Sequence, residues 1–108
     1  MNLNEVIKEK YGSYAFEKAG ELLFKWPDVL KIINYCEKNN IIVVGMNFWI
    51  QRGKDIIEIN STNYEDINIG FGASQKTTKA ARALIKDKLP DNASYVSFVL
   101  GYETQPSK

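Results

Sequence analysis

The sequence predicts an α+β fold, a two-layer sandwich in which a small, mostly antiparallel sheet carries helices on one face. Three observations lead to this prediction. Residues 41–50 are apolar and rich in β-branched side chains, which is typical of a central strand. A Gly-containing turn and a second strand pattern over 55–60 follow, which indicates a hairpin. Amphipathic segments with helical spacing flank this hairpin, and a last strand is expected over 95–102.

The first third of the chain has the spacing of three helices. The first is expected over 3–11, where apolar residues share one side and Gly12 ends the helix. A second is expected from Ser13, as its cap, to Leu23, although Gly20 weakens it. Its apolar side would consist of Phe16, Ala19, Leu22 and Leu23. The third begins at Pro27-Asp28, where proline suits a first turn, and ends at Asn39-Asn40.

The hairpin and the second half of the chain follow in order. Gln51 to Lys54 connect the two strands, with Gly53 supplying a positive φ. Residues 61–72 are polar and Asn-rich, so we expect a loop there, within which a short fourth strand is possible over 64–71. Ser74 is expected to cap a helix over 75–88. The buried side of that helix would consist of Ala80, Ala81, Leu84 and Ile85.

Composition limits the possible functions. The chain has 108 residues, enough for a single domain over 1–108, and we expect 104–108 to be a frayed tail. The formal net charge is +1, so no basic field exists to hold a nucleic acid. There is no histidine, which removes the usual general base and the commonest metal ligand. Cys36 is the single cysteine and lies on an apolar helix stripe, so we expect a core residue. We therefore expect no catalytic residue, metal or cofactor.

The chain has no predicted membrane segment. Its longest apolar run is shorter than the ~18–20 residues that cross a bilayer. The first residues lack the basic and then apolar layout of a signal peptide. We therefore expect a cytoplasmic protein.

One segment is similar to a phosphate-binding loop. Gly70 to Thr77 matches G-x-x-x-x-G-K-[ST] except that Gln75 occupies the second glycine position. The preceding residues, 63–69, are polar instead of forming the buried strand that such a loop follows. Nucleotide or small-molecule binding at this loop stays as an alternative function.

The candidate contact residues lie on and after the hairpin. By alternation, Asn47 and Trp49 share one sheet face, while Met46, Phe48 and Ile50 share the other. If the helices cover the second set, Trp49 lies on the open face, either as a contact anchor or beneath a loop. An acidic and aromatic rim is expected near it, formed by Glu58, Tyr64, Glu65 and Asp66, and Asp55 is a further candidate contact residue. Pairing of this face or of an edge strand with itself would instead make a homodimerisation module.

The order of these motifs resembles the immunity protein forty family of bacterial polymorphic-toxin systems, of the contact-dependent inhibition type. The resemblance covers about residues 14–102. It is carried by the helix 29–37, the strand 41–45, the Asn63-Tyr64 motif, Ser74 with 80–84, and the strand 95–100. Where the family has G-G-D-V, this chain has Gly45-Met46-Asn47-Phe48.

The resemblance implies an inhibitor and not an enzyme, so it brings no catalytic residue to this chain. It implies that the protein binds a cognate toxin domain, often a nuclease, inside the producing cell. The expected complex is one-to-one, with a monomeric inhibitor. The contact residues expected for it are Asn47, Trp49, Asp55, Glu58, Tyr64, Glu65 and Asp66.

Overall fold

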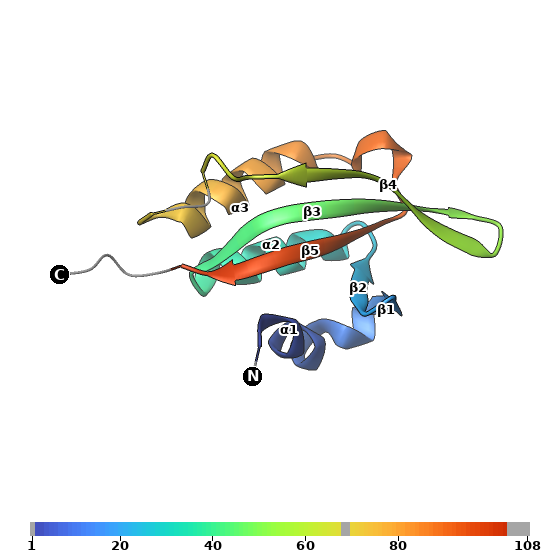
Figure 1. Ribbon diagram of the computed structural model, residues 1–108, viewed down its shortest axis with the longest axis horizontal. Coiled ribbons are helices and arrows are strands. Elements are labelled where there is room, and N and C mark those ends of the chain that lie inside the picture. Colours follow the sequence, from blue (N-terminus) through green and yellow to red (C-terminus); the bar gives the residue numbers. More distant parts are fainter. Residues whose placement is uncertain (1, 68–69, 104–108) are drawn as a thin grey trace.

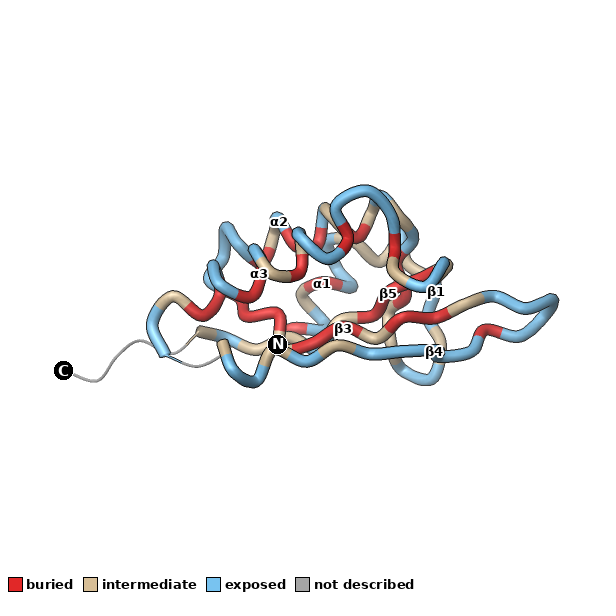
Figure 2. Tube along the Cα trace, turned by 90° about the horizontal axis from the view of Figure 1, so that it is seen from above, coloured by how far each residue is buried: buried red, intermediate tan, exposed pale blue. Residues whose placement is uncertain are grey.

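The computed structural model describes residues 2–67 and 70–103. In these ranges the chain forms a five-stranded antiparallel sheet with strand order β1-β2-β5-β3-β4 (Figure 1). The helices lie together on one face of the sheet (Figure 2), so the predicted α+β fold is confirmed. The elements are α1 (Leu3–Tyr11), η1 (Gly12–Tyr14), β1 (Ala15–Lys18), β2 (Glu21–Phe24), α2 (Asp28–Lys38), β3 (Ile41–Arg52), β4 (Asp55–Asn63), α3 (Ala73–Leu84), η2 (Pro90–Asn92) and β5 (Tyr95–Tyr102).

The main core lies between the helices and the sheet. Helix α2 buries Val29, Ile32, Ile33 and Cys36, as its apolar stripe predicts. The sheet contributes buried side chains from β2, β3 and β5, among them Phe24, Met46, Phe48 and Val96. Burial of one such side chain stabilises the fold by about 1.5–3 kcal/mol. No helix in the described ranges combines the length and the apolar character needed to cross a bilayer.

The β3–β4 hairpin is longer than its sequence pattern indicates. The turn lies at Gly53-Lys54, with φ of 59° at Gly53, as expected. Strand β4 continues to Asn63, so 61–63 belong to a strand and not to the predicted loop. Figure 2 shows the far end of the hairpin extending beyond the helices, where most of its residues are exposed.

Two irregularities shape β3. Its register with β5 shifts between Val43 and Gly45, so Val44 is an extra residue in β3. Beside this bulge, a Cβ built on Gly45 would lie 2.6 Å from the Thr62 carbonyl oxygen of β4, so only glycine fits. The paired residues of β3 and β4 end at Gly45. Before that point the Val43 N–H donates a hydrogen bond to Thr77 Oγ1 of α3 at 3.0 Å.

The prediction of a helix between Ser13 and Leu23 is wrong. This segment forms the β1–β2 hairpin, in which Lys18 pairs with Glu21 across a two-residue turn. Ala19 and Gly20 in that turn have φ of 52° and 81°, the positive values that a tight hairpin requires. The apolar spacing that indicated a helix results from two strands that each place apolar side chains on the sheet.

The predictions for the last helix need correction. Helix α3 begins at Ala73 after Gly72, which is left-handed with φ of 84°, so Ser74 does not cap it. The helix ends at Leu84, earlier than predicted, and Leu84 is exposed instead of buried. Its buried side consists of Ala73, Ser74, Thr77, Thr78 and Ala81, with Ile85 just after the helix.

The remaining predictions concern the loop and the tail. Residues 64–67 and 70–71 form turns and bends instead of the short strand considered for 64–71. Residues 68–69 of that segment lie outside the described residues, as does the predicted tail at 104–108.

Candidate functional site

The sheet face opposite the helices, here called the open face, is the candidate site. Phe24, Phe48 and Val96 point into the main core, so their neighbours along each strand point the other way. Cross-strand pairing places Asn47 beside Ser97 and Trp49 beside Tyr95 on this open face. Figure 1 views the molecule from this side, with the strands in front of α2 and α3.

A hydrogen-bonded network connects three strands on the open face. The Ser97 hydroxyl donates to Glu21 Oε1 at 2.9 Å, and Asn47 Nδ2 donates to the same oxygen at 3.3 Å. Trp49 Nε1 donates to Ser97 Oγ at 3.0 Å. The four side chains come from β2, β3 and β5, so the network fixes the β1–β2 hairpin to the centre of the sheet. Asn47, the polar residue of an otherwise apolar strand, thus has a specific partner.

Trp49 is buried on the open face and is not an exposed anchor. Only 7% of its surface is accessible. It belongs to a second buried cluster with Leu23 of β2, Ile56 of β4 and Tyr95 of β5. The cover over the indole ring therefore includes side chains of the sheet itself, which neither of the two predicted arrangements included.

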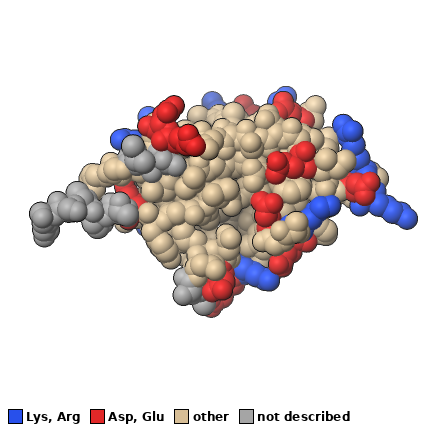
Figure 3. Space-filling view, in the orientation of Figure 1, with Lys and Arg blue, Asp and Glu red and all other residues tan. Residues whose placement is uncertain are grey.

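Apolar side chains around this cluster remain accessible. Phe16 of β1 is 49% exposed, and its ring lies 6.2 Å from the Tyr95 ring. Val99 of β5, on the same face as Ser97, is 47% exposed. Figure 3 shows that most of this face is uncharged, with separate acidic groups and some Lys or Arg side chains beside them. The end of the β3–β4 hairpin carries the basic residues Arg52 and Lys54.

The predicted acidic and aromatic rim does not form one patch, and the further candidate Asp55 lies apart as well. Glu58 pairs with Trp49 and lies with it on the open face, whereas Asp55 pairs with Arg52 at the end of the hairpin. Tyr64 follows the other end of β4, which is about 25–30 Å away at ~3.3 Å per residue. Of the predicted contact residues, the structure therefore brings together Asn47, Trp49 and Glu58.

The remaining three predicted residues lie beyond β4. Tyr64 packs against the main core, and burial raises the pKa of its hydroxyl, an effect that the nearby Thr62 side chain partly offsets. Glu65 is exposed, and its N–H donates to Asn63 Oδ1 at 2.7 Å in a local turn. Asp66, next in this turn, is also exposed. Neither carboxylate reaches the network on the open face.

Sequence reasoning missed two central residues of the site, Glu21 and Ser97. Glu21 was assigned to a helix, and Ser97 is the single polar residue between apolar neighbours in β5. The available signal was Gly20 between two short apolar runs, because glycine adopts the positive φ that a tight hairpin turn requires.

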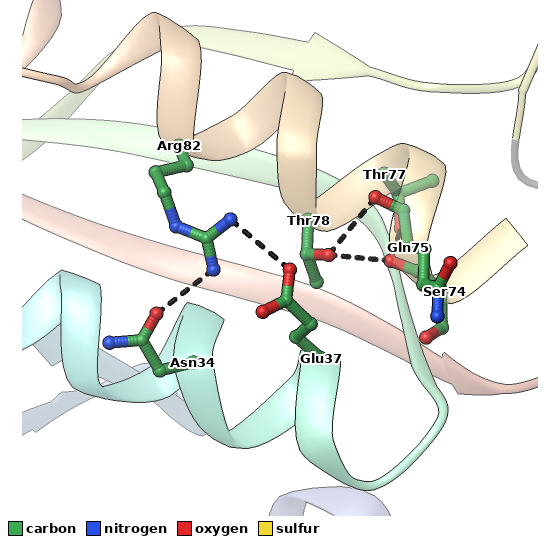
Figure 4. A network of polar contacts seen from close by, with 7 residues as sticks. All are labelled: Asn34, Glu37, Ser74, Gln75, Thr77, Thr78 and Arg82. Carbon is green, nitrogen blue, oxygen red and sulfur yellow. Dashed lines mark hydrogen bonds and ion pairs between the residues drawn. The ribbon is translucent and has the colours of Figure 1, made fainter.

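The loop from Gly70 to Thr77 presents little of its predicted phosphate-binding chemistry. Thr77 is fully buried, and its hydroxyl accepts from Val43 as described above. Ser74 is also fully buried, and its carbonyl accepts from the Thr78 hydroxyl at 2.7 Å (Figure 4). Both hydroxyl-bearing positions of the motif therefore face the interior of the protein.

Figure 4 also shows how α2 and α3 are joined at their surface. Arg82 Nη1 lies 3.2 Å from Glu37 Oε2, and Arg82 Nη2 donates to Asn34 Oδ1 at 2.9 Å. The ion pair is partly exposed, so it contributes at most about 1 kcal/mol. Its role here is to align two helices. Among the described residues, no group of three or more Cys, Asp or Glu side chains is placed to hold a metal ion.

The chain matches no protein-family model, and no curated protein or solved structure is significantly similar to it. The candidate site therefore rests on the geometry of the open face.

Proposed function

We propose that this protein is an immunity protein that binds a cognate toxin domain through the open face and thereby blocks it in the producing cell. The observation that carries the proposal is the accessible, mostly uncharged sheet face with Phe16 and Val99 exposed beside a buried aromatic cluster. The resemblance of the motif order to the immunity protein forty family supplies the class of partner, a toxin domain such as a nuclease.

A second feature supports a binding role for this face. Its centre is already fixed by hydrogen bonds between Glu21, Asn47, Trp49 and Ser97. Binding would therefore immobilise few side chains, which lowers the entropic cost of association. A rigid sheet with apolar groups around a fixed polar centre is suited to one-to-one contact with a complementary protein surface.

Co-expression with the toxin domain encoded beside this gene tests the proposal. Cell survival reports inhibition, and calorimetry on the purified pair reports affinity and stoichiometry. We expect protection and a one-to-one complex for the unchanged protein. Absence of both with every neighbouring toxin domain would contradict the proposed function.

A pair of matched variants tests the surface. Val99 on the open face and Leu84 on α3 are both apolar and are 47% and 45% exposed. Val99→Glu places a charge on the proposed contact surface and should abolish protection. Leu84→Glu places the same charge on the helix side and should leave protection intact. If Leu84→Glu alone abolished binding, the contact surface would be on α3 instead.

Homodimerisation is a second candidate, and one observation favours it. Strand β4 is an edge strand of nine residues, and Ile57 and Ile59 on it are exposed. A free strand edge of this length can pair with a second copy. The extra residue at Ile59, where the register with β3 shifts, bends the edge and opposes such pairing. Sedimentation of the purified protein at high concentration decides between monomer and dimer.

A further inference from the structure

Glu21 is a fixed carboxylate with one oxygen left free. Its Oε1 accepts hydrogen bonds from Ser97 and Asn47, which fills the lone pairs of that oxygen. Its Oε2 bonds to no described residue and is not one of the buried unpaired atoms, so solvent reaches it. Two donors therefore hold the carboxylate in a fixed position on the open face.

No Lys or Arg side chain among the described residues forms an ion pair with this carboxylate. The ion pairs among residues 2–67 and 70–103 involve neither Glu21 nor Glu58, the two carboxylates on the open face. Lys18 is the cross-strand partner of Glu21 but forms no ion pair with it. Lys18 and Lys25 also lie on this face, Lys25 with its Nζ 5.8 Å from the centroid of the Tyr95 ring, so the face as a whole is not negative. The Glu21 carboxylate itself has no ion-pair partner among the described residues, and a positively charged group is the electrostatic complement of that carboxylate.

We infer that Oε2 of Glu21 binds a lysine or arginine side chain of the partner protein, an inference that rests on the proposed function. Asn47 and Ser97 act as positioning residues, because they hold the carboxylate through its other oxygen. Val99, two residues after Ser97 on the same face, would contact the partner and exclude water from the pair. A charge pair shielded in this way is screened by salt less than a pair in open solvent.

The variant Glu21→Gln tests the charge while keeping the local geometry. Its amide oxygen can accept the same two hydrogen bonds, so the network and the fold are retained. Glu9→Gln on α1 is the control, since it removes one negative charge at an exposed position on the helix side. Both variants change the net charge equally, so a difference in their affinity for the toxin domain shows that the position of the charge matters.

Binding to the toxin domain is measured by calorimetry at low and at high salt. We expect Glu21→Gln to bind about tenfold or more weakly and to show a weaker salt dependence than the unchanged protein. Glu9→Gln should bind within about twofold of the unchanged protein, a difference of less than 0.5 kcal/mol. Equal affinity and equal salt dependence for Glu21→Gln would overturn the inference while leaving the proposed function in place.

A measurement on the unchanged protein covers the case in which the variant fails to fold. Carbodiimide labelling followed by mass spectrometry reports which carboxylates are accessible. Glu21 should be labelled in the free protein and protected in the complex, whereas Glu9 should be labelled in both. Full labelling of Glu21 in a complex that does form would overturn the inference. Failure of the unchanged protein to bind any toxin domain would instead refute the proposed function.

Discussion

Gly45→Ala adds a single methyl group, yet the structure predicts that it destabilises the protein. A Cβ added there would lie 2.6 Å from the Thr62 carbonyl oxygen and 3.7 Å from the Asn63 Cα, both backbone atoms of β4. Backbone atoms cannot turn away as a flexible side chain can. Gly45→Ala must therefore push β3 and β4 apart or break their pairing at this end.

The expected loss of stability follows from two opposing terms. Overpacking in a well-packed region costs about 1–3 kcal/mol, and a backbone contact belongs at the upper end of that range. Replacement of a glycine lowers the entropy of the unfolded chain and returns about 0.4–1 kcal/mol. The net expectation for Gly45→Ala is a destabilisation of about 2 kcal/mol.

Gly101→Ala is the matched control. Gly101 lies in β5, and a Cβ there would meet the Val44 Cγ2 at 3.6 Å, an ordinary contact. This variant should be neutral or slightly more stable than the unchanged protein. Urea denaturation followed by tryptophan fluorescence gives the free energy of unfolding for all three proteins. If Gly45→Ala and Gly101→Ala were equally stable, the close approach of β4 to β3 would not be present in solution.

Three further predictions concern buried groups. Thr77→Val removes the acceptor of the Val43 N–H and should cost about 1–3 kcal/mol in urea denaturation, whereas Thr77→Ser keeps the hydroxyl and should cost less. Trp49→Ala should destabilise the protein by about 3–5 kcal/mol because the side chain is buried. A variant that keeps its stability but no longer binds the partner would contradict this buried position. Burial raises the pKa of the Cys36 thiol from 9.0 to about 12, so the native protein should resist thiol reagents at pH 8. Because the folded state holds this proton more tightly, the thiol's contribution to stability should be lost as the pH rises from 9 through about 12. In Cys36→Ala, the free energy of unfolding should no longer show this decrease with pH.

The central part of the fold is predictable from the sequence because local signals and burial agree there. The helix over 28–38 has a proline at its start, an apolar stripe and Asn at its end, and all three are consistent with the structure. The strand beginning at Ile41 is buried on both faces at its start, as its β-branched run indicates. Such segments need no information from distant parts of the chain.

The β1–β2 hairpin was not predictable on the same basis. Its two strands have four residues each, and four residues are too few to distinguish the alternation of a strand from the spacing of a helix. Tertiary contacts decide its conformation: Leu23 is buried beside Trp49, and Glu21 bonds to Ser97 and Asn47. The candidate site was therefore only partly predictable, because half of its polar network comes from this hairpin or from β5.

The bulge at Val44 connects the core to the candidate binding surface. Ile41 and Val43 point toward the helices, and strict alternation from them would place Asn47 and Trp49 there too. The extra residue reverses this parity, so Met46 enters the core and Asn47 reaches the open face. A change that alters the register at this point, such as Gly45→Ala, should therefore weaken stability and partner binding together. Glu21→Gln leaves the register intact, so it should weaken binding alone, and this difference separates the surface from the scaffold that presents it.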